Sequence, residues 1–85
     1  YQQLYYFSEN NSECDFVVCE KNAPVRLIQV CLELHRENET REVEGLREAM
    51  RFFKMNTGII ITLDQTDKIR VDEGWIDVIP AYQFM

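Results

Sequence analysis

The chain has 85 residues and a formal net charge of −6, with 15 acidic residues against 9 lysines and arginines. This length suits one small domain with a modest core. The acidic balance disfavours nucleic acid as a partner, because phosphate binding depends on Lys and Arg. No apolar run approaches the roughly 20 residues that span a membrane, so the sequence predicts no membrane segment.

Three strands are predicted in the first part of the chain. Residues 4–7 are aromatic and strand-prone, and "SENNS" follows them as a turn. Residues 14–19 form the second predicted strand, "EKNAP" the next turn, and residues 25–34 the third strand. Short turns between successive strands predict that the three strands are antiparallel.

An amphipathic helix is predicted between residues 40 and 55. Its apolar residues recur at steps of three and four: Val43, Leu46, Met50 and Phe53. The charged residues between them are expected to point toward solvent: Arg41, Glu42, Glu44, Arg47, Glu48 and Arg51. Asn38 or Thr40 can cap the amino end, and Gly58 is expected to end the helix in a left-handed conformation.

Three further strands are predicted after the helix. "GIIITL", at residues 58–63, is continuous and β-branched, which predicts a strand buried on both faces. Residues 68–72 and 75–79 form two short strands around "DEG". Pro80 then ends the pairing. The aromatic residues Trp75, Tyr82 and Phe84 are expected to complete the core or a contact between domains.

The third predicted strand is apolar on both of its faces. One face carries Ile28, Val30, Leu32 and Leu34, and the other carries Val25 and Leu27. A single helix can cover only one of these faces. We therefore expect the second face to be covered by a preceding helix, by a neighbouring domain or by another copy of the chain.

Five motifs in this order carry a resemblance to a known family. They are "ECDFVV" at 13–18, "LIQVC" at 27–31, "ETRE" at 39–42, "GIIITLD" at 58–64 and "IDVIPAYQF" at 76–84. The series resembles the carboxy-terminal domain of DEXX-box, archaeal-type AAA+ ATPases, a domain of unknown function. The resemblance implies an α/β fold with a restriction-endonuclease-like mixed β-sheet and one amphipathic helix packed on one face.

The resemblance also implies a context for the chain. Residues 1–85 would be a single carboxy-terminal accessory domain excised from a longer ATPase chain, and its first partner would be its own upstream ATPase domain. ATP and Mg²⁺ would belong to that upstream domain, with no cofactor in this fragment. The glycines at 45, 58 and 74 never form GxxxxGK, so this fragment contains no P-loop.

The motifs place a nuclease-like site on the second and third strands. Active relatives of that fold use an acid on one strand and acid-x-lysine on the next to bind Mg²⁺ and activate water. Asp15 occupies the first position, but Gln29 and Cys31 occupy the acid and lysine positions. A neutral amide and a soft thiol suit Mg²⁺ poorly. We therefore expect no catalytic or metal site, although Glu13 and Asp64 could rescue one.

Cysteine and histidine residues offer a second candidate metal site. Cys14, Cys19, Cys31 and His35 have spacings that resemble short zinc-ligand pairs. Strand geometry separates them, because residues 14 and 19 have opposite parity. The thiols are expected to be small buried hydrophobes and His35 a surface residue. Three cysteines fit no disulfide framework, which predicts a reducing, cytoplasmic location.

These observations predict a non-catalytic accessory or interaction domain. A weak metal-dependent DNA nuclease and a nucleic-acid-binding module stay open as alternatives, and so does a homo-oligomer formed through the uncovered sheet face.

Overall fold

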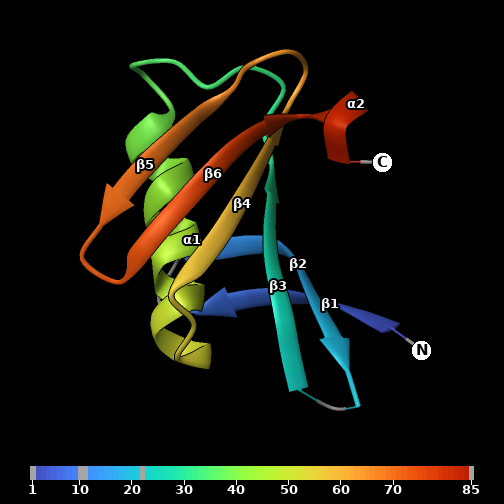
Figure 1. Cartoon of the computed structure of the whole chain (residues 1–85). Coiled ribbons are helices and arrows are strands. Elements are labelled where there is room, and N and C mark those ends of the chain that lie inside the picture. The colour runs from blue at the N-terminus through green and yellow to red at the C-terminus, as the bar shows by residue number, and fades with distance from the viewer. Residues whose placement is uncertain (1, 10–11, 22, 85) are drawn as a thin grey trace.

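The computed structural model describes residues 2–9, 12–21 and 23–84, and the side chains of residues 17–21 and 23–83. The described residues form an α/β fold in which one long helix packs on a mixed sheet (Figure 1). The elements in chain order are β1 (Gln2–Glu9), β2 (Ser12–Glu20), β3 (Ala23–Val30), α1 (Glu39–Phe53), β4 (Thr57–Thr62), β5 (Asp67–Val71), β6 (Gly74–Pro80) and α2 (Ala81–Phe84).

The sheet has six strands in the order β1-β2-β3-β4-β6-β5. β1, β2 and β3 are successive antiparallel neighbours, which confirms the prediction for the first half of the chain. β4 lies parallel to β3 and to β6, and β5 is antiparallel to β6. Parallel neighbours need a crossover connection, and α1 supplies it between β3 and β4.

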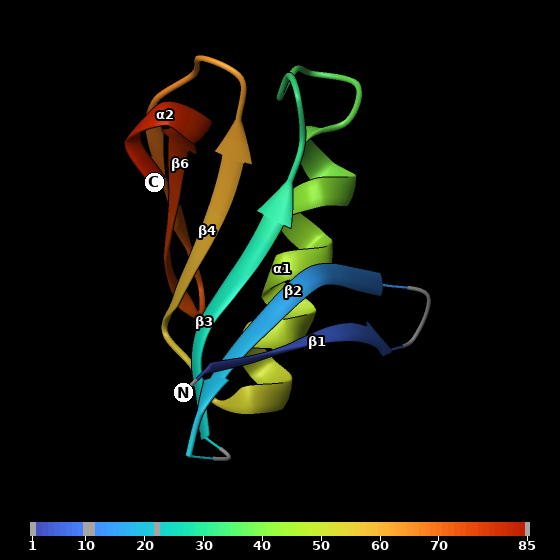
Figure 2. The same cartoon turned by 90° about the vertical axis from the view of Figure 1, so that its right-hand side faces the viewer.

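The core lies between α1 and one face of the sheet. Leu46, Ala49 and Met50 of α1 are fully buried. They pack against a set of buried side chains from four strands: Val17, Cys19, Leu27, Ile60, Ile76 and Val78. Figure 2 shows α1 on one side of β3 and β4, whereas the short α2 lies on the other side, at the end of β6. The predicted amphipathic helix and its single covered face are therefore confirmed.

The end of α1 differs from the prediction. The helix stops at Phe53, and Lys54 takes the left-handed conformation with a φ of 57°. Gly58 lies in β4 instead, where a Cβ atom would come within 2.8 Å of the Leu46 side chain. Glycine is needed here because the helix approaches the strand closely, and no left-handed conformation is involved.

Two strand predictions need correction. β3 ends at Val30, and the predicted residues 31–34 belong to the connection that leads to α1. In β4, Gly58, Ile60 and Thr62 are buried while Ile59 and Ile61 are half-buried. The expected burial on both faces is met on the α1 side only, because Ile59 and Ile61 on the other side are half-buried. None of the helices described is long and apolar enough to cross a membrane.

Candidate functional site

The residue at the expected second acid position faces α1. Gln29 of β3 pairs with Ile60 of β4, and Ile60 pairs with Val78 of β6. The side chains of Ile60 and Val78 are both buried in the core. Neighbouring residues in register share a face of the sheet, so Gln29 lies on the covered face. Its side chain is polar in an apolar layer, and only 6% of the residue is exposed.

Glu42 of α1 satisfies the buried amide. The Nε2 of Gln29 donates a hydrogen bond of 3.0 Å to Oε1 of Glu42, whose side chain is 13% exposed. Oε2 of the same carboxylate accepts from Arg41, at 3.4 Å. The prediction that Glu42 points toward solvent is therefore wrong. The carboxylate of Glu42 thus lies beside Gln29, at the strand position where active nucleases carry an acidic residue.

Cys31, at the expected lysine position, has a protonated thiol. Its Sγ donates to the carbonyl oxygen of Glu33 at 3.2 Å and accepts from Nδ2 of Asn38 at 3.4 Å. Burial, followed by the negative charge of Glu42, raises the pKa of the thiol above its ordinary value. A thiol that stays protonated at neutral pH is neither a nucleophile nor a metal ligand.

For Asp15 and Glu13, the two acids of β2 considered as metal ligands, only the backbone position is described. Asp15 and Glu13 lie in β2, and their side chains fall outside the described part of the chain. The pairing of β2 with β3 begins at Phe16 with Ile28, and Asp15 and Gln29 are the next residues along the two strands. The backbone therefore brings Asp15 and Gln29 close together on neighbouring strands.

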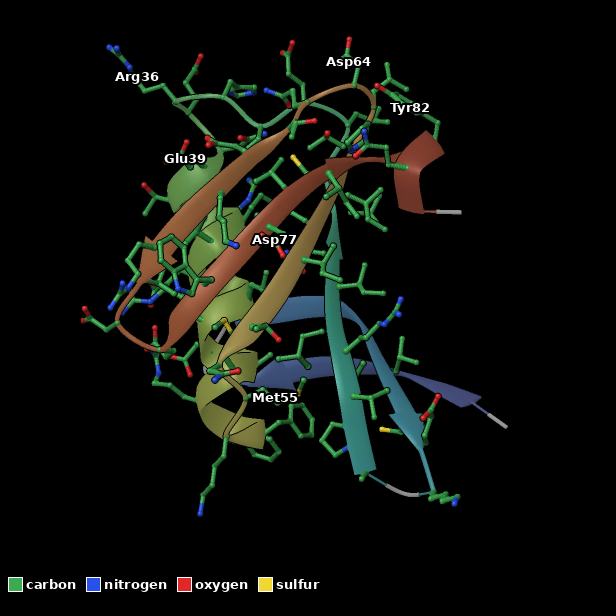
Figure 3. All side chains as sticks on the ribbon, viewed as in Figure 1. Arg36, Glu39, Met55, Asp64, Asp77 and Tyr82 are labelled. Atoms are coloured by element: carbon green, nitrogen blue, oxygen red, sulfur yellow. The ribbon has the colours of Figure 1, made fainter. Side chains whose placement is uncertain are left out.

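Asp64, the other acid considered as a ligand, is exposed in the turn that follows β4 (Figure 3). Among the described side chains, no group of three or more His, Cys, Asp or Glu is arranged to hold a metal ion.

The candidate zinc residues do not come together either. Cys19 is buried in the core, Cys31 is half-buried and hydrogen-bonded as above, and both are free thiols. His35 is exposed, as predicted, and its Nδ1 accepts a hydrogen bond from the backbone N–H of Glu37. The side chain of Cys14 lies outside the described residues.

The connection between β3 and α1 is fixed by polar side chains. Gln65 binds the backbone of Leu34 twice, with Oε1 accepting from its N–H at 2.7 Å and Nε2 donating to its carbonyl at 2.9 Å. Asn38 occupies the amino-terminal cap position, but its side chain binds Cys31, Glu33 and His35 instead of capping the helix. These bonds hold Cys31 beside the amino end of α1.

The charged side of α1 forms a network with the β5–β6 turn. Arg47 donates to Glu73 at 2.8 Å and to Glu44 at 3.2 Å. Arg51 binds Glu73 and also donates to Glu48 at 2.6 Å. Glu44 and Glu48 each lie three residues before their arginine on the helix, whereas Glu73 joins the helix to a segment distant in the chain. The network ties the end of the helix to the sheet edge.

Replacing Glu73 by glutamine should lower the free energy of unfolding by about 1 kcal/mol at pH 7, given the partial exposure of its partners. The hydrogen bonds from Arg47, and then from Arg51, lower the pKa of Glu73 to about 2. A lowered folded-state pKa gives stability that is present above the ordinary pKa of 4.5 and lost as the pH falls toward 2. Urea unfolding from pH 2 to pH 7 should show the two proteins converging at the acid end.

The matched control is Asp64→Asn, which removes an exposed acid outside the network and should change stability by less than about 0.5 kcal/mol at any pH. An equal loss for Glu73→Gln at pH 2 and pH 7 would contradict the ion-pair account.

The face of the sheet away from α1 is open and apolar at one end. Val30, Ile61 and Ile79 are aligned across β3, β4 and β6 by the register of the strands. Leu32 and Leu63 lie two residues after Val30 and Ile61, just past the ends of β3 and β4. The backbone N–H of Leu63 donates a hydrogen bond to the carbonyl oxygen of Leu32. Their exposed fractions are 73% and 65%, so nothing described covers them.

Two of the three aromatic residues near the end of the chain do not complete the core. Tyr82, in α2, is 68% exposed, and Trp75 is exposed in β6, so of the two expected roles the core role is wrong for both and a contact between domains stays a prediction. Lys68 and Arg70 of β5 lie over the Trp75 ring, with Nζ at 5.3 Å and Cζ at 5.0 Å from its centroid. The side chain of Phe84 lies outside the described residues.

Comparison with known proteins finds a relative of the chain but assigns it to no family. No protein-family model matches the chain, and no solved structure matches it. The sequence is 34% identical over 89 aligned residues to Uncharacterized protein MJ1544 of Methanocaldococcus jannaschii. The alignment covers 98% of this chain and 20% of the relative, so the chain spans about a fifth of the length of the curated relative that it matches.

Proposed function

We propose that the chain is a non-catalytic accessory domain of a larger, AAA+ type DEXX-box ATPase, with a restriction-endonuclease-like sheet whose metal site is degenerate. The order of motifs in the sequence supports this reading, as does the mixed sheet with its single covered face. A relative about five times the length of the chain is consistent with a domain that works within a longer polypeptide.

The observation that carries the proposal is the hydrogen bond between Gln29 and Glu42. A divalent cation needs charged oxygen ligands that are open to it. Here the position that would supply one holds a neutral amide, and the nearby carboxylate already accepts hydrogen bonds from that amide and from Arg41. The thiol of Cys31 replaces the lysine that would polarise the attacking water. Two of the three parts of the catalytic machinery are absent.

In this proposal the partner of the domain is its own upstream ATPase domain, and ATP and Mg²⁺ are bound there. Reduced cysteines at positions 19 and 31 support a cytoplasmic location, because free thiols persist in reducing compartments. The domain contributes to assembly, substrate engagement or regulation of the ATPase.

Calorimetric titration of the chain with Mg²⁺ and Mn²⁺ tests the inert site. We expect no binding with a dissociation constant below about 1 mM, since the described carboxylate beside Gln29, that of Glu42, already accepts hydrogen bonds from Gln29 and Arg41. Linear and branched DNA incubated with the chain and either metal should stay intact. Metal binding at micromolar concentration that is lost in Asp15→Ala would contradict the proposal.

A weak metal-dependent nuclease is the second candidate, and Glu42 is the observation that favours it. Its largely buried carboxylate lies beside Gln29, and it could replace the acid that the strand lacks. In that case both Asp15→Ala and Glu42→Gln should abolish cleavage, whereas Asp64→Asn should not. Cleavage that none of these variants removes would indicate a contaminating nuclease.

A further inference from the structure

Five apolar residues lie together at one end of the open face, and we call them the open-face patch. Val30, Ile61 and Ile79 are aligned across β3, β4 and β6. Leu32 and Leu63 lie just past the ends of β3 and β4. Val30, Leu32 and Leu63 are 45%, 73% and 65% exposed. Exposed apolar side chains on a monomer usually occur singly, so a group of this kind indicates a binding surface.

The segments that lead away from the patch are acidic. Glu33 directly follows Leu32, and Asp64 directly follows Leu63. The connections after β3 and β4, each counted with the first residue of the next element, contain five acids and one arginine. Their net charge is therefore −4, out of −6 for the chain, with histidine neutral. All six side chains are exposed: Glu33, Arg36, Glu37, Glu39, Asp64 and Asp67.

These acids are not neutralised within the chain. Among the described residues, none of the five forms an ion pair. The single arginine of these segments, Arg36, lies toward α1, whereas Asp64 lies between it and Tyr82 in the view of Figure 3. Like charges without counterions create a negative potential, so a cationic partner is attracted to this end of the sheet.

The cations of the open face do not offset this charge. Arg26 and Arg70 lie on the same face, but each is about four residues along the strands from the patch, which is roughly 13 Å. Lys68 is nearer, and its Nζ lies 3.8 Å from Oδ1 of Asp77. The charges directly beside the patch are therefore negative.

The geometry of the patch suits one helix. Three neighbouring strands span about 10 Å, since strands lie about 4.8 Å apart. A helix with its side chains is about 10 Å wide. On the opposite face of the same strands, α1 already packs in this way through Leu46, Ala49 and Met50. The short α2 lies on the open-face side, at the end of β6 (Figure 2), and it leaves Leu32 and Leu63 largely exposed.

Other occupants fit these observations less well, because each would bring negative charge to the acids. A second copy of the chain would place Glu33 and Asp64 against the same residues of its partner. The phosphates of nucleic acid bind through Lys and Arg, which are absent beside the patch. An anionic membrane surface likewise attracts basic segments and would be repelled here.

We propose that the open-face patch binds an amphipathic helix of a protein partner, whose leucine-type stripe is bordered by Lys and Arg. The stripe covers Val30, Ile61, Leu63 and their neighbours, and the basic border faces Glu33 and Asp64. This inference does not depend on the proposed ATPase context, because it rests on the surface of this chain alone.

Calorimetric titration of the 85-residue chain with two synthetic peptides tests the proposal. Both peptides have about 15 residues, the length at which helices become stable, and leucines at positions i, i+3, i+4 and i+7. One peptide has lysines beside the stripe, and the other has glutamines. In about 0.1 M salt we expect the lysine peptide to bind about tenfold more tightly. In about 1 M salt, where charges are screened beyond about 3 Å, the two affinities should converge.

Two double variants separate the apolar contribution from the charge contribution. Leu32→Ser with Leu63→Ser should weaken binding of both peptides at least tenfold and leave the circular dichroism spectrum unchanged, because both side chains are largely exposed. Glu33→Gln with Asp64→Asn should remove the preference for the lysine peptide and leave the affinity for the glutamine peptide unchanged.

Matched controls lie away from the patch. Glu20→Gln with Asp72→Asn removes the same charge from the end of β2 and from the β5–β6 turn, at the far ends of their strands, and should leave the preference for lysine unchanged. Phe52→Ser replaces an aromatic side chain that is 57% exposed on α1, on the covered face, and should leave the binding of both peptides unchanged.

Several results would overturn the proposal. One is equal affinity for the two peptides in low salt, and another is no measurable binding of either. A third is a dimer of the chain, measured by sedimentation, that Leu32→Ser with Leu63→Ser abolishes, because the occupant would then be a second copy. Single-stranded DNA or anionic lipid vesicles that bind this face more tightly than the lysine peptide would likewise exclude a basic helical partner.

Discussion

Replacing Gly74 by alanine is expected to cost the chain about 3 kcal/mol or more of its free energy of unfolding. Gly74 begins β6 with a φ of +150°, a conformation that residues with a side chain rarely adopt. A Cβ atom there would lie 2.0 Å from the backbone oxygen of Asn56. That oxygen accepts the N–H of Trp75 at 3.0 Å, so the clash falls on a bond that positions β6 against the start of β4.

Equilibrium unfolding in urea, followed by far-ultraviolet circular dichroism, measures this effect. Proteins of this size have a free energy of unfolding on the order of 4 to 13 kcal/mol, so the predicted loss is a large share of the total and should clearly lower the urea midpoint. The control is Asp72→Ala in the same turn, where the side chain is 98% exposed and the loss should stay below about 0.5 kcal/mol. A Gly74→Ala protein as stable as the control would mean that the β5–β6 turn can move away from Asn56 at little cost.

The six strands and the long helix could be predicted in their order because local patterns set them, whereas the four-residue helix α2 was not predicted. Spacings of three and four residues identified α1, and turn residues separated the strands. The end of α1 and the role of Gly58 could not be predicted, because both depend on contacts between distant segments. Lys54 ends the helix, whereas Gly58 is glycine because the Leu46 side chain lies against it from the helix. Nothing in the local sequence marks Lys54 as the end of the helix. Gly58 does stand out in the sequence, but a glycine at this position resembles the glycine that commonly ends a helix.

The candidate site shows the same division. Asp15, Gln29 and Cys31 were singled out because their spacing resembles a known motif; the backbone places Asp15 on β2 and Gln29 on β3, and Cys31 directly after the end of β3. Glu42 was assigned to the solvent-facing side of α1, although it lies four residues before the buried Leu46 and so on the same side of the helix. That spacing was a usable signal. The network around Glu73 had no comparable signal, because its partners are more than 20 residues away.

The Gln29→Glu variant should lose about 2 kcal/mol of its free energy of unfolding at pH 7, the second large effect that we expect. The new carboxylate would stand where the Gln29 amide now donates to Glu42 at 3.0 Å, and both side chains are largely buried. Two carboxylates at this distance repel each other, and neither has a proton to share at neutral pH unless the pKa of one rises. Adding Glu42→Gln to the variant reverses donor and acceptor and should restore most of the loss.

The loss in Gln29→Glu should depend on pH and on divalent metal. Repulsion raises the folded-state pKa of the pair, so the penalty is absent below the ordinary glutamate pKa of about 4.3 and grows as the pH rises above it. Urea unfolding at pH 4 and pH 7 should therefore differ more for the variant than for the wild type. Because the variant regains an acid on the strand next to Asp15, Mn²⁺ should stabilise it and leave the wild type unchanged. A wild type that Mn²⁺ stabilises equally would show that Glu42 already serves as the missing ligand, and the inert-site proposal would then fail.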